Sequence, residues 1–149
     1  MDAYSGLNHW LDQIALRLEP TQRRELMRRL AQGLRVRQRD RIKQQRDPDG
    51  NRFVPRKRNQ IGNRKRQGAL FQKIGREIKT EYSADKAAIG FGGRTAQIAK
   101  VHQEGKTIKP SRYAKATKYP IRELIGFSQD DEKWISEEII VFMSKISLN

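Results

Sequence analysis

Residues 21–45 read TQRRELMRRLAQGLRVRQRDRIKQQ, a stretch in which apolar and basic side chains follow the period of an α-helix. The apolar residues that fall near one face are Leu26, Leu30, Leu34 and Ile42, with Met27 beside them. The arginines that cover much of the remaining surface are Arg23, Arg24, Arg28, Arg29, Arg35, Arg37, Arg39 and Arg41. Gly33 lies inside the stretch, where glycine costs about 1 kcal/mol relative to alanine. We therefore predict one long basic helix whose narrow apolar stripe is buried on a small sheet.

The residues before this stretch predict a shorter first helix. Apolar side chains recur at helical spacing at Leu7, Trp10, Leu11, Ile14 and Leu18. Pro20 interrupts this pattern, because proline fits the first turn of a helix but not its interior. We therefore expect the first helix to end before Pro20 and the long helix to begin there.

The residues after the long helix predict a turn and then a flexible basic loop. Asp47-Pro48-Asp49-Gly50 is a strong turn signal, which is read either as a plain turn or as a docking element for a partner. Residues 56–68 are rich in arginine and lysine, contain two glycines and have little apolar content. We expect this loop to become ordered only against a partner.

The central residues predict a β-hairpin followed by a helix. Ile78, Thr80 and Tyr82 alternate with charged residues, a polar turn follows at residues 83–86, and residues 87–91 suit a return strand, which is typical of two antiparallel strands. Thr95 could cap a helix over residues 96–104, and Gly105 is suited to end it. Residues 106–118 are polar and basic, and we predict a second loop there.

The C-terminal residues predict a last helix. Ser128 and Asp131 are spaced as a capping box, and the acids at 130–132 would lie in the first turn, where the helix dipole favours them. The apolar residues on one face of this helix are Trp134, Ile135, Ile139, Phe142, Met143 and Ile146. Residues 119–128 would then be a connector packed on the core, with an interface role as the open alternative. The predicted fold class is α+β: one domain over residues 1–149, with helices at both ends packed on a small antiparallel sheet.

The composition gives little support for catalysis. The 149-residue chain has no cysteine, which excludes disulfides, thiolate nucleophiles and thiolate metal ligands. Its two histidines, His9 and His102, have no partner at metal-ligand spacing, and Gly105-Lys106-Thr107 lacks the upstream glycine of a phosphate-binding loop. We therefore expect no enzyme activity, cofactor or metal.

The chain also lacks the sequence features of membrane insertion or export. It has no apolar stretch of the roughly 20 residues that a membrane helix needs. Residues 1–10 lack the pattern of a signal peptide. We therefore expect no membrane partner and a protein that is made and used in a cytoplasm or assembled from there.

Charge is distributed unevenly along the chain, whose formal net charge is +15. Residues 17–66 hold 18 lysines and arginines against 5 acidic residues, whereas residues 123–149 hold 2 lysines against 6 acids. Such a chain can bind nucleic acid along its basic part, or it can bind acidic protein surfaces, including the acidic end of an identical copy. A solvated basic helix face is the simplest alternative. Residues 17–66 contain one aromatic residue, Phe53, so base stacking has few platforms.

Several stretches, taken together, resemble one known family. The first combines LNHWL at residues 7–11 with LEP at residues 18–20 and the arginine-rich helix. The second is RDPDGNRFVPRK at residues 46–57. The third combines IAKVHQEG at residues 98–105 with YPIRELIGFS at residues 119–128. In this order and at these distances, they resemble the phage virion morphogenesis family over nearly the whole chain.

The resemblance implies a structural component of the virion, located in the tail and neck of a contractile-tailed phage and assembled in the bacterial cytoplasm. It would complete the tail at its head-proximal end after tube and sheath have polymerised, and enable head–tail joining. Kinship with ring-forming tail terminator and neck proteins implies a homo-oligomeric ring, with a hexamer favoured. The implied partners are tail tube or sheath proteins and head-completion or connector proteins, with transiting DNA as a further candidate.

Charged residues and one tyrosine are the candidates for these contacts, because a head-to-tail ring joins one patch to a different patch on the next copy. The candidate interface residues are Arg28, Arg35, Arg39, Arg52, Arg56, Arg58, Arg64, Arg66, Tyr119, Arg122, Glu123, Asp130 and Asp131. Arg122 and Glu123 are also expected to form an internal ion pair. Two alternatives remain open: a basic nucleic-acid-binding protein, and an assembly chaperone that is absent from the mature virion.

Overall fold

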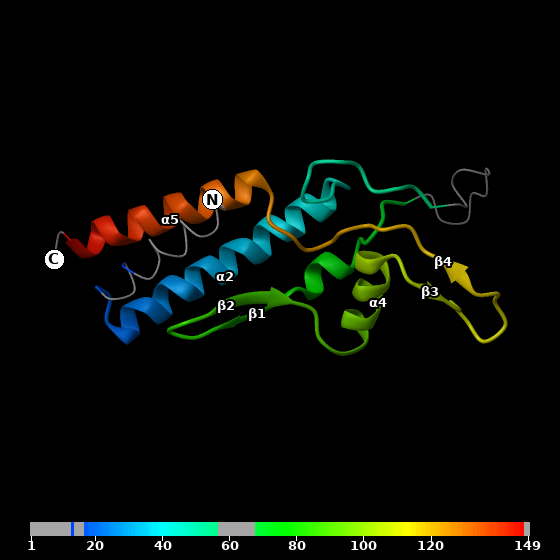
Figure 1. Ribbon diagram of the computed structural model, residues 1–149, viewed down its shortest axis with the longest axis horizontal. Coiled ribbons are helices and arrows are strands. Elements are labelled where there is room, and N and C mark those ends of the chain that lie inside the picture. Colours follow the sequence, from blue (N-terminus) through cyan, green and yellow to red (C-terminus); the bar gives the residue numbers. More distant parts are fainter. Residues whose placement is uncertain (1–12, 14–16, 57–67, 148–149) are drawn as a thin grey trace.

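A computed structural model describes residues 13, 17–56 and 68–147. Its central element is the long helix α2 (Pro20–Lys43), which runs through the middle of an elongated molecule (Figure 1). Helix α5 (Gln129–Ser147) lies along one side of α2, and a hairpin of strands β1 (Lys79–Tyr82) and β2 (Ala87–Gly90) lies along the other. The predicted α+β fold class, with its long helix packed on a small antiparallel sheet, is confirmed.

Helix α2 begins where the sequence predicts, and its apolar stripe is buried, although against α5 and the central elements and not on the sheet alone. Pro20 lies in the first turn, and the backbone N–H of Glu19 donates a 3.0 Å hydrogen bond to the side chain of Gln22 in a capping box. The predicted apolar residues Leu26, Leu30, Leu34 and Ile42 are all buried. Gln38, which continues the same four-residue spacing, is buried with them.

Two apolar clusters lie against different parts of α2. One joins its first half to α5 through Leu26, Leu30, Ile139 and Phe142, with Leu18 and partly buried side chains around them. The other surrounds Ile42 and is formed by Phe53, Ile74, Ile78, Ala99 and Leu124. The first cluster therefore holds α5 against α2. The second holds the central elements and the connector against the end of α2.

The predicted β-hairpin is confirmed. Strands β1 and β2 pair antiparallel, with Lys79 opposite Gly90 and Tyr82 opposite Ala87. The short 3-10 helix η2 (Ile74–Glu77) leads into β1 and buries Ile74 and Gly75.

Helix α4 (Gly93–Glu104) begins three residues earlier than predicted. Gly92, not Thr95, occupies the N-cap position, and the hydroxyl of Thr95 instead donates a short hydrogen bond to Glu77. The prediction of Thr95 as the cap was therefore wrong, because the glycine pair before it already turns the chain into the helix. Gly105 ends α4 in the left-handed conformation, with a φ of 65°, as predicted.

Residues 106–118 are not wholly a loop, so that prediction needs correction. They form a second hairpin, in which β3 (Thr107–Ile108) pairs antiparallel with β4 (Thr117–Lys118). β-Branched residues at its base favour strand geometry, whereas the polar and basic tip hides that short pattern in the sequence. Figure 1 shows this hairpin extending from the end of the molecule beyond α4.

The last helix begins with the predicted capping box. The N–H of Asp131 donates to the Ser128 hydroxyl at 2.9 Å, and the N–H of Ser128 donates to the Asp131 carboxylate at 3.1 Å. The predicted apolar face of α5 packs on α2, with Ile139 and Phe142 buried.

Some predictions concern residues outside the described part of the chain. The first helix predicted over residues 7–18 lies there except for Gln13, Arg17 and Leu18, and most of the basic loop at residues 56–68 lies there too. Within the ranges that are described, no helix is long and apolar enough to cross a membrane.

Candidate functional site

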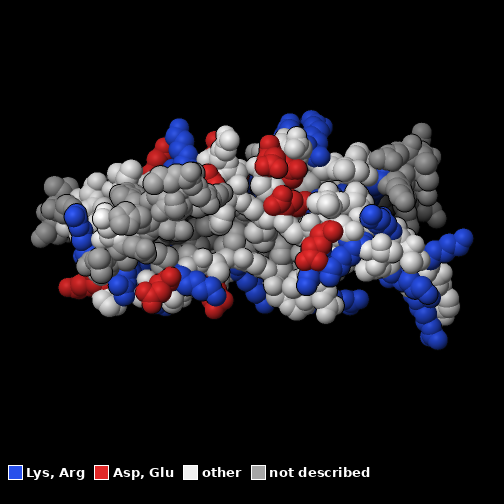
Figure 2. Space-filling model, in the orientation of Figure 1, with Lys and Arg blue, Asp and Glu red and all other residues white. Residues whose placement is uncertain are grey.

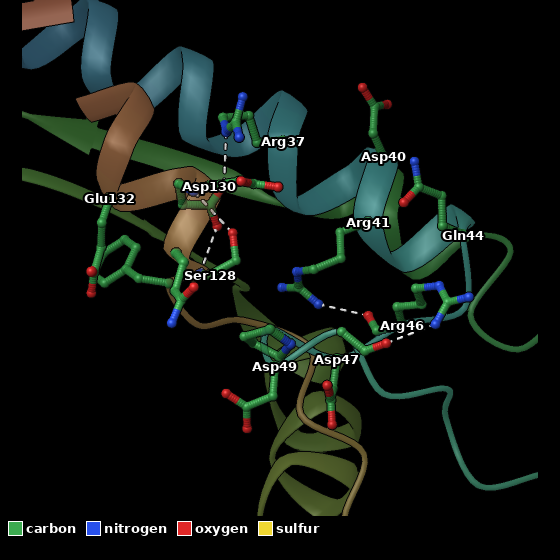
Figure 3. A pocket seen from close by; sticks show the side chains of 15 residues that line it. Arg37, Asp40, Arg41, Gln44, Arg46, Asp47, Asp49, Ser128, Asp130 and Glu132 are labelled. Atoms are coloured by element: carbon green, nitrogen blue, oxygen red, sulfur yellow. Dashed lines mark hydrogen bonds and ion pairs between the residues drawn. The ribbon is translucent and has the colours of Figure 1, made fainter. Parts of the chain in front are cut away.

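A hollow of about 630 Å³ opens where the end of α2, the turn at residues 47–50 and the start of α5 meet (Figure 3). We call it the carboxylate groove. The acidic residues that line it are Asp40, Asp47, Asp49, Asp130, Asp131 and Glu132, and the basic residues are Arg37, Arg41 and Arg46. Acids therefore outnumber bases by six to three around this hollow.

Asp131 has a structural role in the groove. It is 3% exposed, and its carboxylate accepts hydrogen bonds from Arg37 at 2.7 Å and from the amide of Gln38 at 3.1 Å. Burial raises the pKa of this carboxyl, but the bonds from Arg37 and Ser128 outweigh that effect and hold the pKa below its usual value. Asp131 is thus charged and satisfied inside the protein.

The arginines of the groove are also engaged by the chain itself. Arg37 pairs with Asp131, while Arg41 donates to the carbonyls of Leu124 at 2.7 Å and Arg46 at 2.9 Å. Burial lowers the pKa of Arg41, against the attraction of nearby acids. Arg46 donates to the carbonyl of Gly50 at 2.7 Å, so it closes the turn.

Two carboxylates at the rim of the groove have no such engagement. Asp49 and Asp130 are exposed, and neither carboxylate forms an ion pair or hydrogen bond with the described part of the protein. Figure 3 shows Asp49 on the turn across the hollow from the start of α5, where Asp130 lies. Phe127, 57% exposed, lines the same hollow. The groove therefore offers free negative charge beside an exposed aromatic ring.

The second hairpin has the opposite charge. Residues 105–122 contain no acidic residue, and five exposed cations recur at every third position: Lys106, Lys109, Arg112, Lys115 and Lys118. Figure 2 shows basic side chains projecting from the end of the molecule where Figure 1 places β3 and β4. We call residues 106–118 the basic arm.

Comparison with known proteins places most of the chain in one family. Residues 2–143 match the phage virion morphogenesis family. The chain belongs to this family. It is 33% identical over 135 residues to the tail completion protein S of Escherichia phage P2. The aligned region covers 86% of this chain and 89% of that protein. No solved structure matches it.

Two segments that carry the resemblance to the phage virion morphogenesis family, residues 98–105 and 119–128, pack against each other. The side chain of Gln103 accepts hydrogen bonds from the N–H groups of Leu124 at 2.7 Å and Ile125 at 3.2 Å, and donates to the carbonyl of Ile125 at 2.9 Å. The ring of His102 lies edge-to-face between Phe71 and Tyr119. These segments therefore fix the connector on α4.

The turn at residues 47–50 also packs on the connector. Pro48 is buried, and a Cβ atom at Gly126 would lie 2.6 Å from the Pro48 ring, so only glycine allows this approach. The turn geometry is confirmed by the 3.0 Å hydrogen bond from the N–H of Gly50 to the carbonyl of Asp47.

Arg122, a predicted contact residue, is buried inside the protein. It is 5% exposed and donates to the carbonyls of Val54 at 2.7 Å and Pro55 at 3.3 Å. The structure gives Arg122 these carbonyl partners in place of the expected ion pair with Glu123. Burial, followed by repulsion from Arg56, lowers the pKa of Arg122.

The other predicted contact residues are dispersed. Arg28 pairs with Glu25 on α2 at 2.5 Å, and Arg56 donates to the carbonyl of Gly68 at 2.5 Å. Arg35, Arg39, Arg52 and Asp130 are exposed, Glu123 is partly buried, and Arg58, Arg64 and Arg66 lie outside the described residues. The structure brings Asp130 and Asp131 together at the groove but does not gather the arginines into one patch.

Gln38 and the cations of the basic arm were not among the predicted contact residues, although residues 106–118 were predicted as a basic loop. Gln38 accepts hydrogen bonds from Arg41 and from the backbone N–H of Gly126, the latter at 3.2 Å, while it donates to Asp131. Its position on the apolar stripe of α2 was the available signal, because a polar residue buried at such a position must be hydrogen-bonded. Among the residues described, no group of histidine, aspartate and glutamate could hold a metal ion.

Proposed function

We propose that this protein is a tail completion subunit that acts at the head-proximal end of a phage tail. Its similarity over 135 residues to the tail completion protein S of Escherichia phage P2 carries this proposal. The protein would be a structural part of the virion, placed on the tail after tube and sheath have assembled, and it would enable joining to a filled head.

We further propose that it acts as a homo-oligomeric ring, with a hexamer favoured. Separate basic and acidic surfaces on one subunit support this arrangement, because a closed head-to-tail ring joins two different patches. Exposed charges such as Arg35, Arg39 and Arg52 would remain available to tube, sheath and head-connector proteins.

Localisation in purified particles tests the proposal. Antibody-gold labelling and mass spectrometry of mature virions should find the protein at the junction of head and tail. Tails from a phage that lacks the gene should accumulate without heads, and supplying the protein should restore joining. Absence of the protein from mature particles, with joining still dependent on it, would instead support an assembly chaperone.

Nucleic-acid binding is a second candidate, favoured by the acid-free basic arm. Each phosphate contact by a lysine or arginine releases counterions, so binding would weaken steeply with salt. A gel shift with duplex DNA at about 150 mM salt tests this function. A lack of binding under that condition would dismiss DNA as a main partner.

A further inference from the structure

The basic arm is built as an unpartnered projection. Lys109, Lys115 and Lys118 have no ion-pair partner among the described residues, and only Lys106 is paired, with Glu104 at 3.4 Å. The arm is held by the pairing of β3 with β4 and by the N–H of Tyr119, which donates to the carbonyl of Lys106 at 3.0 Å. Its cations are therefore free to meet charge from another molecule.

The tip of the arm also carries the kind of residue that anchors protein interfaces. Tyr113 is 92% exposed, and the guanidinium of Arg112 lies 5.9 Å from the centre of its ring. Tyrosine and arginine are enriched among residues that dominate binding energy, because they bury a large area at low entropic cost. A nearly fully exposed tyrosine beside four free cations thus points to a contact surface.

The carboxylate groove offers the complementary features. Its free carboxylates, Asp49 and Asp130, stand at the rim, and its arginines are occupied by internal hydrogen bonds. Phe127 gives the hollow an exposed aromatic wall. A hollow of about 630 Å³ has room for one aromatic side chain and the head groups of neighbouring cations.

We infer that the basic arm of one copy docks in the carboxylate groove of the next copy. In this contact Tyr113 packs near Phe127, while Lys109, Arg112 and Lys115 face Asp49 and Asp130. Within one copy the arm extends beyond α4 (Figure 1), whereas the groove is lined by the end of α2, the turn at residues 47–50 and the start of α5, so the two surfaces are available for a contact between copies. The inference rests on the proposed ring and assigns the two surfaces that build it.

A second copy fits this surface better than DNA does. The same chain carries a surface of opposite charge, and head-to-tail contacts require two different patches on each subunit. The tip offers one exposed aromatic ring, whereas proteins that bind single strands use several rings for successive bases.

Charge reversal of the purified full-length chain tests the inference. The arm variant carries Lys109→Glu, Arg112→Glu and Lys115→Glu, and the groove variant carries Asp49→Lys and Asp130→Lys. Each should weaken self-association by at least about 100-fold, because charges of the same sign would then face each other. The control variant carries Lys73→Glu, Arg94→Glu and Lys100→Glu, which reverse three exposed cations outside the basic arm. Its self-association should be close to that of the wild type.

Mixing the two variants gives a second, independent measurement. The acidic arm of one variant faces the basic groove of the other, and the remaining arm and groove keep their original signs. Mass photometry should therefore show oligomers in the mixture but not in either variant alone. Circular dichroism and urea unfolding establish that every variant is folded.

Two outcomes overturn the inference. One is a wild-type chain that stays monomeric at all concentrations tested, and the other is an arm variant that associates as the wild type does. Loss of DNA binding in that arm variant, with unchanged association, would assign the arm to DNA instead. The proposed role at the tail end is judged separately by the position of the protein in mature particles, whereas a monomeric wild type would also contradict the proposed ring.

Discussion

Gly33 shows how one residue sets the distance between two helices. A Cβ atom at this position would lie 2.1 Å from the Trp134 indole, so α5 can approach α2 here only because position 33 has no side chain. The guanidinium of Arg37 lies over the same indole at 5.5 Å. The helix-propensity cost of Gly33 is therefore offset by the packing of Trp134.

Gly33→Ala should destabilise the protein by about 2 kcal/mol, although alanine is the better helix former. The added methyl group would displace the indole from the contact between α2 and α5. Urea unfolding followed by circular dichroism measures the change, and Gln32→Ala, on the exposed side of the same turn, is the control. A stabilised Gly33→Ala protein would show that the indole can move at no cost.

His102 should make stability depend on pH. Burial, and then the charge of Arg122, lowers the pKa of His102 from 6.5 to about 4. The unfolded chain therefore binds a proton at this site below pH 6.5, while the folded chain stays neutral until about pH 4. The contribution of His102 to the free energy of unfolding is therefore fully present above pH 6.5 and is lost as the pH falls toward 4.

His102→Phe keeps a ring between Phe71 and Tyr119 but removes the titration. Because the ring is partly reached by solvent, which screens the interaction, we expect the loss of unfolding free energy between pH 6.5 and 4 to shrink by only about 1 kcal/mol. Urea unfolding across this range measures the slope. His9→Phe, at the other histidine of the chain, should leave the slope unchanged if His102 is its source.

At the scale of elements, the connector at residues 119–128 depends on α4. Gln103 satisfies two backbone N–H groups and one carbonyl of the connector with a single side chain. Gln103→Met, which keeps the length of the side chain, leaves those groups unpaired and should cost about 2 kcal/mol. Differential scanning calorimetry measures the loss.

Gln97→Met, at an exposed position of the same helix, is the matched control for this change. Hydrogen exchange should also increase at the N–H groups of Leu124 and Ile125 in Gln103→Met. Unchanged exchange there, together with unchanged stability, would show that solvent replaces the side chain without penalty.

The elements with strong local signals were predictable from the sequence. The leucine spacing predicts α2, the alternation at residues 78–82 followed by a polar turn predicts the β1–β2 hairpin, and the Ser128–Asp131 pair marks the start of α5. The β3–β4 pairing was not predictable, because two paired residues on each side carry almost no periodicity. The carboxylate groove was also hidden, since its acids come from segments about 90 residues apart in sequence and only the tertiary fold brings them together.

At the scale of the whole molecule, the division of charge differs from the one expected from the sequence. The prediction set the basic residues 17–66 against the acidic residues 123–149 of another copy, but part of that attraction is satisfied within the chain by the Arg37–Asp131 pair. Other arginines of α2 lie over aromatic rings, as Arg24 does over Tyr82 and Arg29 over Phe142. Among the described residues, the basic arm and the rim of the groove therefore keep free charge of opposite sign that is not used within the chain.

Salt should separate assembly from folding. Raising sodium chloride from about 0.1 M to about 1 M shortens the screening length from about 10 Å to about 3 Å, so exposed charge pairs between copies lose most of their attraction. Self-association should weaken by at least about tenfold, while the urea midpoint changes little because the Arg37–Asp131 pair is mostly buried.

Sedimentation velocity at several protein concentrations measures the association at each salt concentration. An association that strengthens with salt would point instead to apolar contacts, for which the exposed Ile140 and Val141 of α5 are available.

Gly105, in its left-handed conformation between α4 and β3, sets the direction in which the basic arm leaves the body of the protein. In a circle of identical copies, the number of members is a full revolution divided by the rotation from one copy to its neighbour. If the arm meets the next groove, the bend at this one joint sets the circumference of the assembly and so the diameter of the opening at its centre. A residue that forced a different bend would change how many copies close the circle while leaving every docking side chain in place.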